Sequence, residues 1–428
     1  MLISFRVRNY RSIRDEKELT LVASPLQGGV MSIIPTKERI GVNLVKAAAI
    51  YGPNASGKTN MLRALSYMRL AVVHSHKDWS VDGPIPYFPF KLDPAFNGAP
   101  SAFEVDAIIG GVRYKYGFEQ DSTSILSEWL YAYPNKVRQE WFRRSPGNQF
   151  EFKRRIAGRA SLTKLTRTNS LFLSAAVQNG NEELVPVYNW FQRQVLFLRN
   201  ETRELHRLHT LDRCKKPEYG EIIAKLLTMA DLGIVGMDTA DRDMAEHMKA
   251  YFQMADIIHA PPTTMKGQMI PSATLRHSTG SGDSVSLPLE DESDGTRAYL
   301  SLLGPLINQI ENGGVLLVDE LEASLHPIVA RHIIELVNAD ENDNGAQLIF
   351  STHDSTLLDP DLLRRDQIWF TEKDASGATD LYPLSDFKTR PNENLRRGYL
   401  QGRYGAIPFV GSSSLFRKIV EGESEAKS

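Results

Sequence analysis

The chain has 428 residues, of which 42% are hydrophobic and 24% charged, and its formal net charge is −2. These values are ordinary for a soluble globular protein, and the length allows two or three domains, or one large domain with an insertion. The single cysteine, Cys214, excludes a disulfide framework and suits a reducing compartment. No apolar run approaches the roughly 20 residues that cross a bilayer, so we expect a cytoplasmic protein without a membrane partner.

Two segments near the N-terminus predict strands. Apolar and polar residues alternate over residues 3–8, which is typical of a half-buried strand. Residues 45–51 form a short apolar run that suits a buried strand.

A glycine-rich loop follows the second strand. Residues 52–59 read Gly-Pro-Asn-Ala-Ser-Gly-Lys-Thr and fit the pattern G-x-x-x-x-G-K-[ST] at every fixed position. In this pattern glycines let backbone N–H groups face phosphates, the lysine reaches the β- and γ-phosphates, and the hydroxyl binds Mg²⁺. Apolar residues over 61–68 then recur on one helix face, so a helix N-terminus points at the phosphates. The predicted nucleotide-binding residues are Gly52, Pro53, Asn54, Ala55, Ser56, Gly57, Lys58, Thr59 and Asn60.

Residues 87–155 combine aromatic-basic alternation with turn signals and predict an antiparallel β lobe. Ten basic residues in the window 136–167 are opposed only by Glu140 and Glu151. This window is either a surface for a polyanion such as DNA or RNA, or the solvated basic face of a twisted hairpin. Charge runs usually mark solvent exposure, which favours the second interpretation.

Residues 179–270 predict a compact helical insertion. Apolar stripes of helical spacing occur over 222–227 and 248–252. Heptads are not sustained over several turns, which excludes a long coiled coil. A predicted hairpin around 280–282 then returns the chain to the part that contains the phosphate loop.

A further apolar strand, residues 315–318, ends in Asp319 and Glu320. Asp319 is placed to bind Mg²⁺, and Glu320 is placed to orient or deprotonate the attacking water. The alternative, two acids that cap a strand, does not explain why an apolar strand ends in a carboxylate pair. The presence of a phosphate loop favours the catalytic interpretation.

Three segments around the acid pair resemble parts of ABC-type ATPases. Residues 292–297 open a predicted helix, where N–H groups form an anion nest. They resemble the signature loop, although a glutamate replaces the usual leading leucine, and the resemblance implies phosphate contacts from Ser293 and Gly295. Residues 323–327 resemble the loop along an ABC dimer interface. His353, which follows the next predicted strand, resembles the histidine that senses the γ-phosphate, and we count it with Glu320 and Lys58 as catalytic.

The order of these motifs resembles the ABC-type ATPase heads of RecF, SMC and OLD proteins. The resemblance implies an α/β fold, an ABC-type P-loop ATPase head with a mixed or parallel sheet, flanking helices and an antiparallel β lobe, plus a compact α-helical insertion. Residues 9–13 are similar to the opening motif of these heads, which implies that Arg11 meets the base and phosphates of the nucleotide. We expect an N-terminal half of the head over 1–178, the insertion over 179–271 and a C-terminal half over 272–428.

Residues 1–24, 51–59, 89–93, 292–297 and 402–409 together resemble the RloA/AriA-type family of ATPases. In that family ATPases commonly act in prokaryotic anti-phage defence beside a separately encoded effector, often a TOPRIM-type nuclease. The resemblance implies an ATPase that binds ATP and Mg²⁺, dimerises head to tail around ATP, and controls such a partner.

A second hypothesis is a DNA-binding ATPase of RecF or SMC type in repair or recombination, for which the window 136–167 binds DNA. The apolar closing segment 398–409 either packs on the head or docks another subunit, and packing is favoured. We expect residues 421–428 to be disordered.

Overall fold

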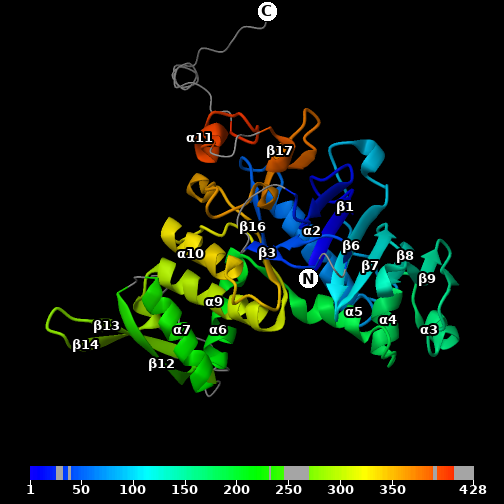
Figure 1. The fold of residues 1–428 in the computed structure, drawn as a ribbon. Helices are drawn as coiled ribbons and strands as arrows, with labels where there is room; N and C mark the ends of the chain where they lie inside the picture. The colour runs from blue at the N-terminus through cyan, green and yellow to red at the C-terminus, as the bar shows by residue number, and fades with distance from the viewer. Residues whose placement is uncertain (26–31, 37–39, 231–232, 245–268, 389–392, 409–428) are drawn as a thin grey trace, which may run out of the picture.

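The computed structural model describes residues 1–25, 32–36, 40–230, 233–244, 269–388 and 393–408. A six-stranded sheet of order β11-β15-β16-β5-β17-β18 forms the centre of the molecule (Figure 1). Its strands are β5 (Ala47–Tyr51), β11 (Val195–Leu198), β15 (Gly314–Val318), β16 (Ala346–Ser351), β17 (Ile368–Lys373) and β18 (Thr379–Pro383). All neighbouring pairs are parallel except β17 and β18, so the polar residues that follow β5, β11, β15 and β16 meet at one edge.

A second, antiparallel sheet forms the predicted β lobe, with the order β10-β9-β8-β7-β6-β1-β2. Its strands are β1 (Leu2–Arg8), β2 (Lys17–Thr20), β6 (Ser101–Ile109), β7 (Val112–Gln120), β8 (Ile125–Tyr133), β9 (Gln139–Ser145) and β10 (Gln149–Glu151). The short strands β3 (Ile33–Ile34) and β4 (Leu44–Val45) pair separately. The predicted first strand is therefore an inner strand of the lobe, between the edge strand β2 and β6.

The central sheet separates two hydrophobic cores, because successive side chains of a strand point to opposite faces. Val315 and Leu317 of β15 belong to the core shared with the β lobe and α2 (Lys58–His74). Leu316 and Val318 belong to the core shared with α9 (Asp294–Asn312) and α10 (Pro327–Asn338). Further helices are α3 (Arg159–Leu165), α4 (Phe172–Gln178), α5 (Val185–Asn189), α6 (Arg203–Arg213), α7 (Pro217–Met229) and α11 (Leu395–Leu400). The mixed sheet, flanking helices and β lobe confirm the predicted fold class.

The range 179–271 contains helices, as expected, and also strands that the sequence analysis did not predict. β11 belongs to the central sheet, and β12 (Ile234–Asp243) pairs with β13 (Met269–Ser278). The predicted hairpin is present, since β13 pairs with β14 (Ser284–Pro288). These three strands project at one end of the molecule, opposite α3 and β9 (Figure 1). The predicted helical stripe over 248–252 lies outside the described residues, and the bounds of the three domains stay predictions.

The described part of the closing segment packs on the central sheet. The rings of Tyr399 and Tyr404 stack on Phe370 of β17, with centroid distances of 5.7 and 5.8 Å. Tyr404 is buried, and Tyr399 also contacts Tyr51 at the end of β5. Residues 421–428 lie outside the described residues, so the expectation of disorder there stays a prediction.

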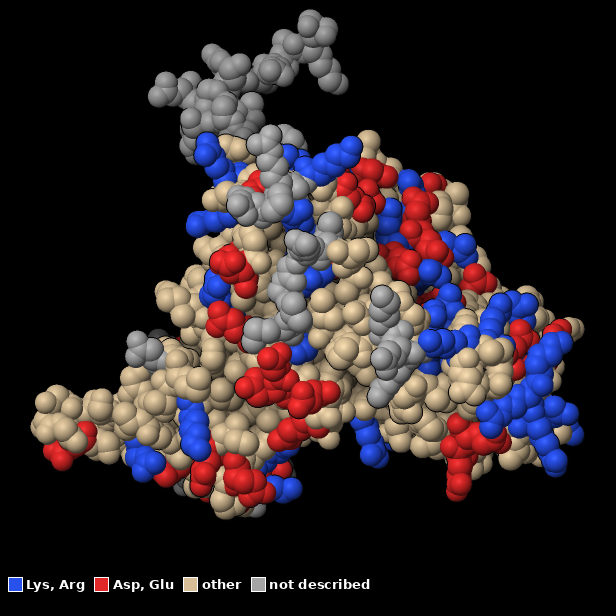
Figure 2. All heavy atoms as spheres, viewed as in Figure 1, with Lys and Arg blue, Asp and Glu red and all other residues tan. Residues whose placement is uncertain are grey.

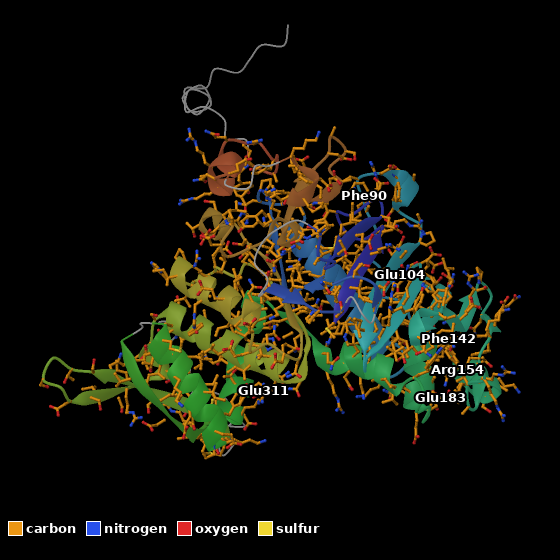
Figure 3. The ribbon with its side chains drawn as sticks, viewed as in Figure 1. Phe90, Glu104, Phe142, Arg154, Glu183 and Glu311 are labelled. Carbon is orange, nitrogen blue, oxygen red and sulfur yellow. The ribbon has the colours of Figure 1, made fainter. Side chains whose placement is uncertain are left out.

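The basic window is divided between the surface and the interior. Figure 2 shows lysines and arginines gathered over the region of β9 and α3. Arg144 is fully buried beside Glu128, and Arg167 donates to the carbonyls of Ser75 and His76. The guanidinium of Arg154 lies over the ring of Trp141 and pairs with Glu183 at 3.4 Å (Figure 3). Several of these charges therefore hold the β lobe together.

Candidate functional site

The phosphate loop joins β5 to α2 and is held from the side by β17 and β18. The hydroxyls of Ser56 and Thr371 are 2.7 Å apart, and Thr379 Oγ1 donates to the carbonyl of Ser56 at 2.8 Å. Gly57 is the N-cap of α2 and has a φ of 115°, where a side chain would be strained and would meet Thr379. The loop therefore has the shape and the glycine that close approach to phosphate requires.

Lys58 is the buried cation of this loop. Its ammonium donates to the carbonyls of Gly52 at 2.8 Å and Pro53 at 3.1 Å. Burial lowers the pKa of Lys58 from 10.5 to about 8, and the charges of Glu322, Asp319 and Glu320 oppose this shift. The ammonium is thus held at the mouth of the loop and has acids around it.

The acid pair lies against the phosphate loop, although 260 residues separate Thr59 from Asp319. Thr59 Oγ1 donates to Asp319 Oδ1 at 2.9 Å. Ser351, the last residue of β16, donates to the same carboxylate oxygen at 2.7 Å and accepts from the N–H of Glu320 at 2.8 Å. One hydroxyl therefore fixes the two acids relative to each other.

The chemistry of this pair suits Mg²⁺. A hydroxyl and a carboxylate within hydrogen-bond distance are hard oxygen donors, and Mg²⁺ in nucleotide sites takes one or two carboxylates together with phosphates and water. Within the described ranges, no three or more His, Cys, Asp or Glu side chains are grouped so that they could hold a metal ion by themselves. Thr59 and Asp319 would hold the ion, which would neutralise phosphate charge.

Two polar residues that the sequence analysis missed lie beside Glu320. Asn200, two residues after β11, donates from Nδ2 to Glu320 Oε2 at 3.2 Å. Arg203 begins α6, and its charge interacts with that of Glu320. The sequence did contain a signal for this segment. The apolar run Val195–Leu198 is followed directly by polar residues, as is the apolar strand before the acid pair.

His353 lies on the same edge, after β16. The backbone N–H of His353 donates to Glu322 Oε1 at 2.5 Å, and the backbone N–H of Thr352 donates to the carbonyl of Ile50. The pKa of His353 is below its ordinary value because of desolvation and, secondarily, the charge of Lys58. The imidazole therefore lies close enough to Lys58 of the phosphate loop for their charges to interact.

Arg11 lies in a loop tied to the start of α2. Ser12 Oγ accepts from Asn60 Nδ2 and from Thr379 Oγ1, both at 2.7 Å. The guanidinium of Arg11 lies 4.8 Å from the ring centre of Phe88. Arg11, Ser12 and Phe88 line a cavity of about 330 Å³, which Lys373 and Gly377 also line. An arginine and an aromatic face at this place suit a nucleotide base.

Ser293 and Gly295 occupy the N-terminus of α9. Ser293 is the N-cap and accepts from the N–H of Thr296 at 3.1 Å. A Cβ at Gly295 would approach the carbonyl of Ser324 to 2.9 Å, so the predicted signature and interface loops are neighbours. Within the described residues of one chain, no hydrogen bond or ion pair links Ser293 or Gly295 to the phosphate loop. The chain therefore brings together the loop, the acid pair and His353, and leaves the α9 terminus separate.

The part of the chain that forms this site matches a known protein family. A family model described as "AAA domain, putative AbiEii toxin, Type IV TA system" matches residues 47–359, a range that contains the loop, the acid pair and His353. The chain belongs to this AAA domain family. Arg11 and the closing segment of the AAA chain lie outside the matched range. No curated protein matches the chain.

The solved structures that resemble this chain include heads of SMC proteins. An SMC head bound to the C-terminal winged-helix domain of ScpA has 12% identity and a TM-score of 0.42, and 89% of this chain and 97% of that chain are covered. The SMC head domain from Thermotoga maritima has 13% identity and a TM-score of 0.39, with 89% and 98% covered. An SMC head from Pyrococcus furiosus bound to the C-terminal domain of ScpA has 12% identity and a TM-score of 0.35, with 89% and 96% covered.

In the described part of the AAA chain, no helix is both long and apolar enough to span a membrane. The roles of the individual site residues stay predictions and are developed below as proposals.

Proposed function

We propose that the AAA chain is an ATP hydrolase that closes head to tail with a second copy around ATP. The single observation that supports this most directly is the hydrogen bond between Thr59 and Asp319, which joins the two halves of a nucleotide site across the sequence. A phosphate loop alone binds nucleotide. A phosphate loop with an adjacent acid pair has the groups that hydrolysis requires.

The proposed roles follow from the positions of the side chains. The backbone of residues 52–59 and the ammonium of Lys58 bind the phosphates, and Arg11 contacts the base side of the nucleotide. Glu320 accepts the proton of the attacking water, because it is the acid next to Asp319 that the phosphate loop leaves free. His353 contacts the γ-phosphate from the neighbouring strand. Mg²⁺, held by Thr59 and Asp319, supplies charge neutralisation when bound.

The affinity for ATP is expected to fall as pH rises through about 8, the pKa of Lys58. Above that pH the free chain loses the ammonium charge that phosphate binding needs, so affinity drops by up to about tenfold per pH unit. Titration with ATP over a pH series by calorimetry measures this. A Lys58→Arg variant keeps its charge throughout and serves as the control. A wild-type affinity that does not change from about pH 7 to about pH 10 contradicts the assignment.

Dimerisation is proposed because Ser293 and Gly295 do not serve the phosphate loop of their own chain, in the residues the structure describes. In a head-to-tail pair, the N–H groups and hydroxyl at the α9 terminus would meet the γ-phosphate bound by the other copy. ATP would then join the two copies.

The test uses two substitutions that both keep the helix cap. Asp and Asn cap helices as well as Ser, but Ser293→Asp places a negative charge against the γ-phosphate and Ser293→Asn does not. We expect the mass measured by light scattering to double for wild type and Ser293→Asn with a non-hydrolysable ATP analogue and Mg²⁺, and Ser293→Asp to stay monomeric. A wild-type monomer in saturating analogue, or an unimpaired Ser293→Asp dimer, would refute the proposal.

We further propose that this ATP-dependent closure controls a separately encoded effector, a nuclease, in anti-phage defence. The support is the resemblance of the chain to RloA/AriA-type ATPases, together with a family description that names a putative toxin of a toxin–antitoxin system. An ATP-dependent change in the distance between two heads is a mechanism by which such a partner could be held or released.

A DNA-binding ATPase of repair or recombination is the second candidate. The basic surface over β9 and α3 favours it (Figure 2). Arg144 and Arg167 of the same window are used inside the β lobe, which reduces the charge available to DNA. We therefore place effector control first.

A further inference from the structure

The side chain of Asn200 lies next to Glu320 and has no role in the mechanism described so far. Asn200 follows β11, and β11 lies directly beside β15, the strand that ends at the acid pair. Its amide donates to Glu320 Oε2 at 3.2 Å.

The backbone of Glu320 is fixed more firmly than its side chain. Glu320 has a φ of 54°, in the left-handed region that non-glycine residues rarely adopt. Its N–H is anchored to Ser351 Oγ at 2.8 Å. In the described part of the chain, its carboxylate accepts one hydrogen bond, from Asn200. The direction of the carboxylate therefore depends on Asn200.

We propose that Asn200 is a positioning residue that directs the Glu320 carboxylate towards the attacking water. The inference rests on the proposed function, because it requires Glu320 to be the base. The amide of Asn200 holds Oε2 and leaves Oε1 free to accept a proton from water.

The principal test is Asn200→Asp, which keeps the shape of the side chain and replaces the donor with a second carboxylate. The donor to Glu320 is then lost and the two carboxylates repel each other, so the Glu320 carboxylate should turn away from the attacking water. We expect kcat to fall about tenfold and the KM for ATP to stay within about twofold. Asn97→Asp makes the same change in an exposed loop of the β lobe and should leave both constants unchanged.

A double-substitution cycle tests whether Asn200 acts through Glu320. Asn200→Ala should lower kcat about tenfold in the wild-type background and have little effect in the Glu320→Gln background.

Two results would overturn the inference. One is an Asn200→Asp enzyme with the kcat of wild type, and the other is an Asn200→Ala effect of equal size in both backgrounds. If Glu320→Gln itself hydrolyses ATP as fast as wild type, the proposed base is wrong and the inference falls with it. If Glu320→Gln is inactive and the Asn200 variants behave as wild type, only the inference fails.

Discussion

Glu320→Gln is expected to lower the rate of ATP hydrolysis by roughly a hundredfold or more, since removal of a general base typically costs that much. Binding of ATP should persist, because Lys58, Thr59 and Asp319 are unchanged and hold the phosphates and Mg²⁺. The glutamine oxygen can still accept the hydrogen bond from Asn200, so the geometry of the loop is kept. The variant should accumulate as an ATP-bound dimer, measured by light scattering and by phosphate release.

The matched control is Glu335→Gln, which removes a glutamate from the exposed side of α10, where it pairs with Arg331. Its hydrolysis rate should equal that of wild type. Wild-type hydrolysis by Glu320→Gln would show that another group accepts the proton. Loss of ATP binding by the same variant would show that Glu320 binds nucleotide and does not act as the base.

Glu128→Gln is expected to lower the free energy of unfolding by about 3–5 kcal/mol, because breaking a buried pair leaves an uncompensated charge. Glu128 and Arg144 are both completely buried, with 3.8 Å between Oε2 and the nearer guanidinium nitrogen. The carboxylate also accepts from the N–H groups of Phe172 and Leu173, which begin α4. Urea unfolding followed by tryptophan fluorescence measures the change, since Trp129 and Trp141 lie in the strands that carry the pair.

Glu119→Gln is the control for this prediction. Glu119 pairs with Arg8 in the same sheet, but the two side chains are 34% and 43% exposed. An exposed pair contributes about 0–1 kcal/mol, so this variant should unfold close to the wild-type midpoint. Equal effects at Glu128 and Glu119 would mean that the buried pair does not stabilise the β lobe.

The central site was predictable where it depends on contiguous residues. The phosphate loop is eight successive residues between a strand and a helix, and its chemistry is local. The strand before Asp319 was visible for the same reason, as an apolar run with an abrupt polar end. The β lobe was predictable because its antiparallel strands are joined by short turns with clear signals.

The missed features depend on contacts between distant segments. β11 has four residues, and an apolar run of that length fits a buried strand or a buried helix equally well. Only its pairing with β15 identifies it as a strand and brings Asn200 to Glu320. Most residues of the strand β12 are exposed or half-buried, and several are charged, so its sequence gave no signal of a sheet.

The basic window shows the same limit for charges. Sequence alone gave the number and sign of the charges, and exposure was the favoured interpretation. Arg144 is buried because a carboxylate on the adjacent strand faces it, and no local pattern encodes that partner.

The sequence by itself determined that this chain carries a phosphate loop and an acid pair, because each is written in one short stretch whose conformation is set locally. Only the tertiary structure decided that they share one site. The parallel order of the central strands brings residues from four distant segments to a single edge, and pairing between strands far apart in sequence is a property of the whole fold.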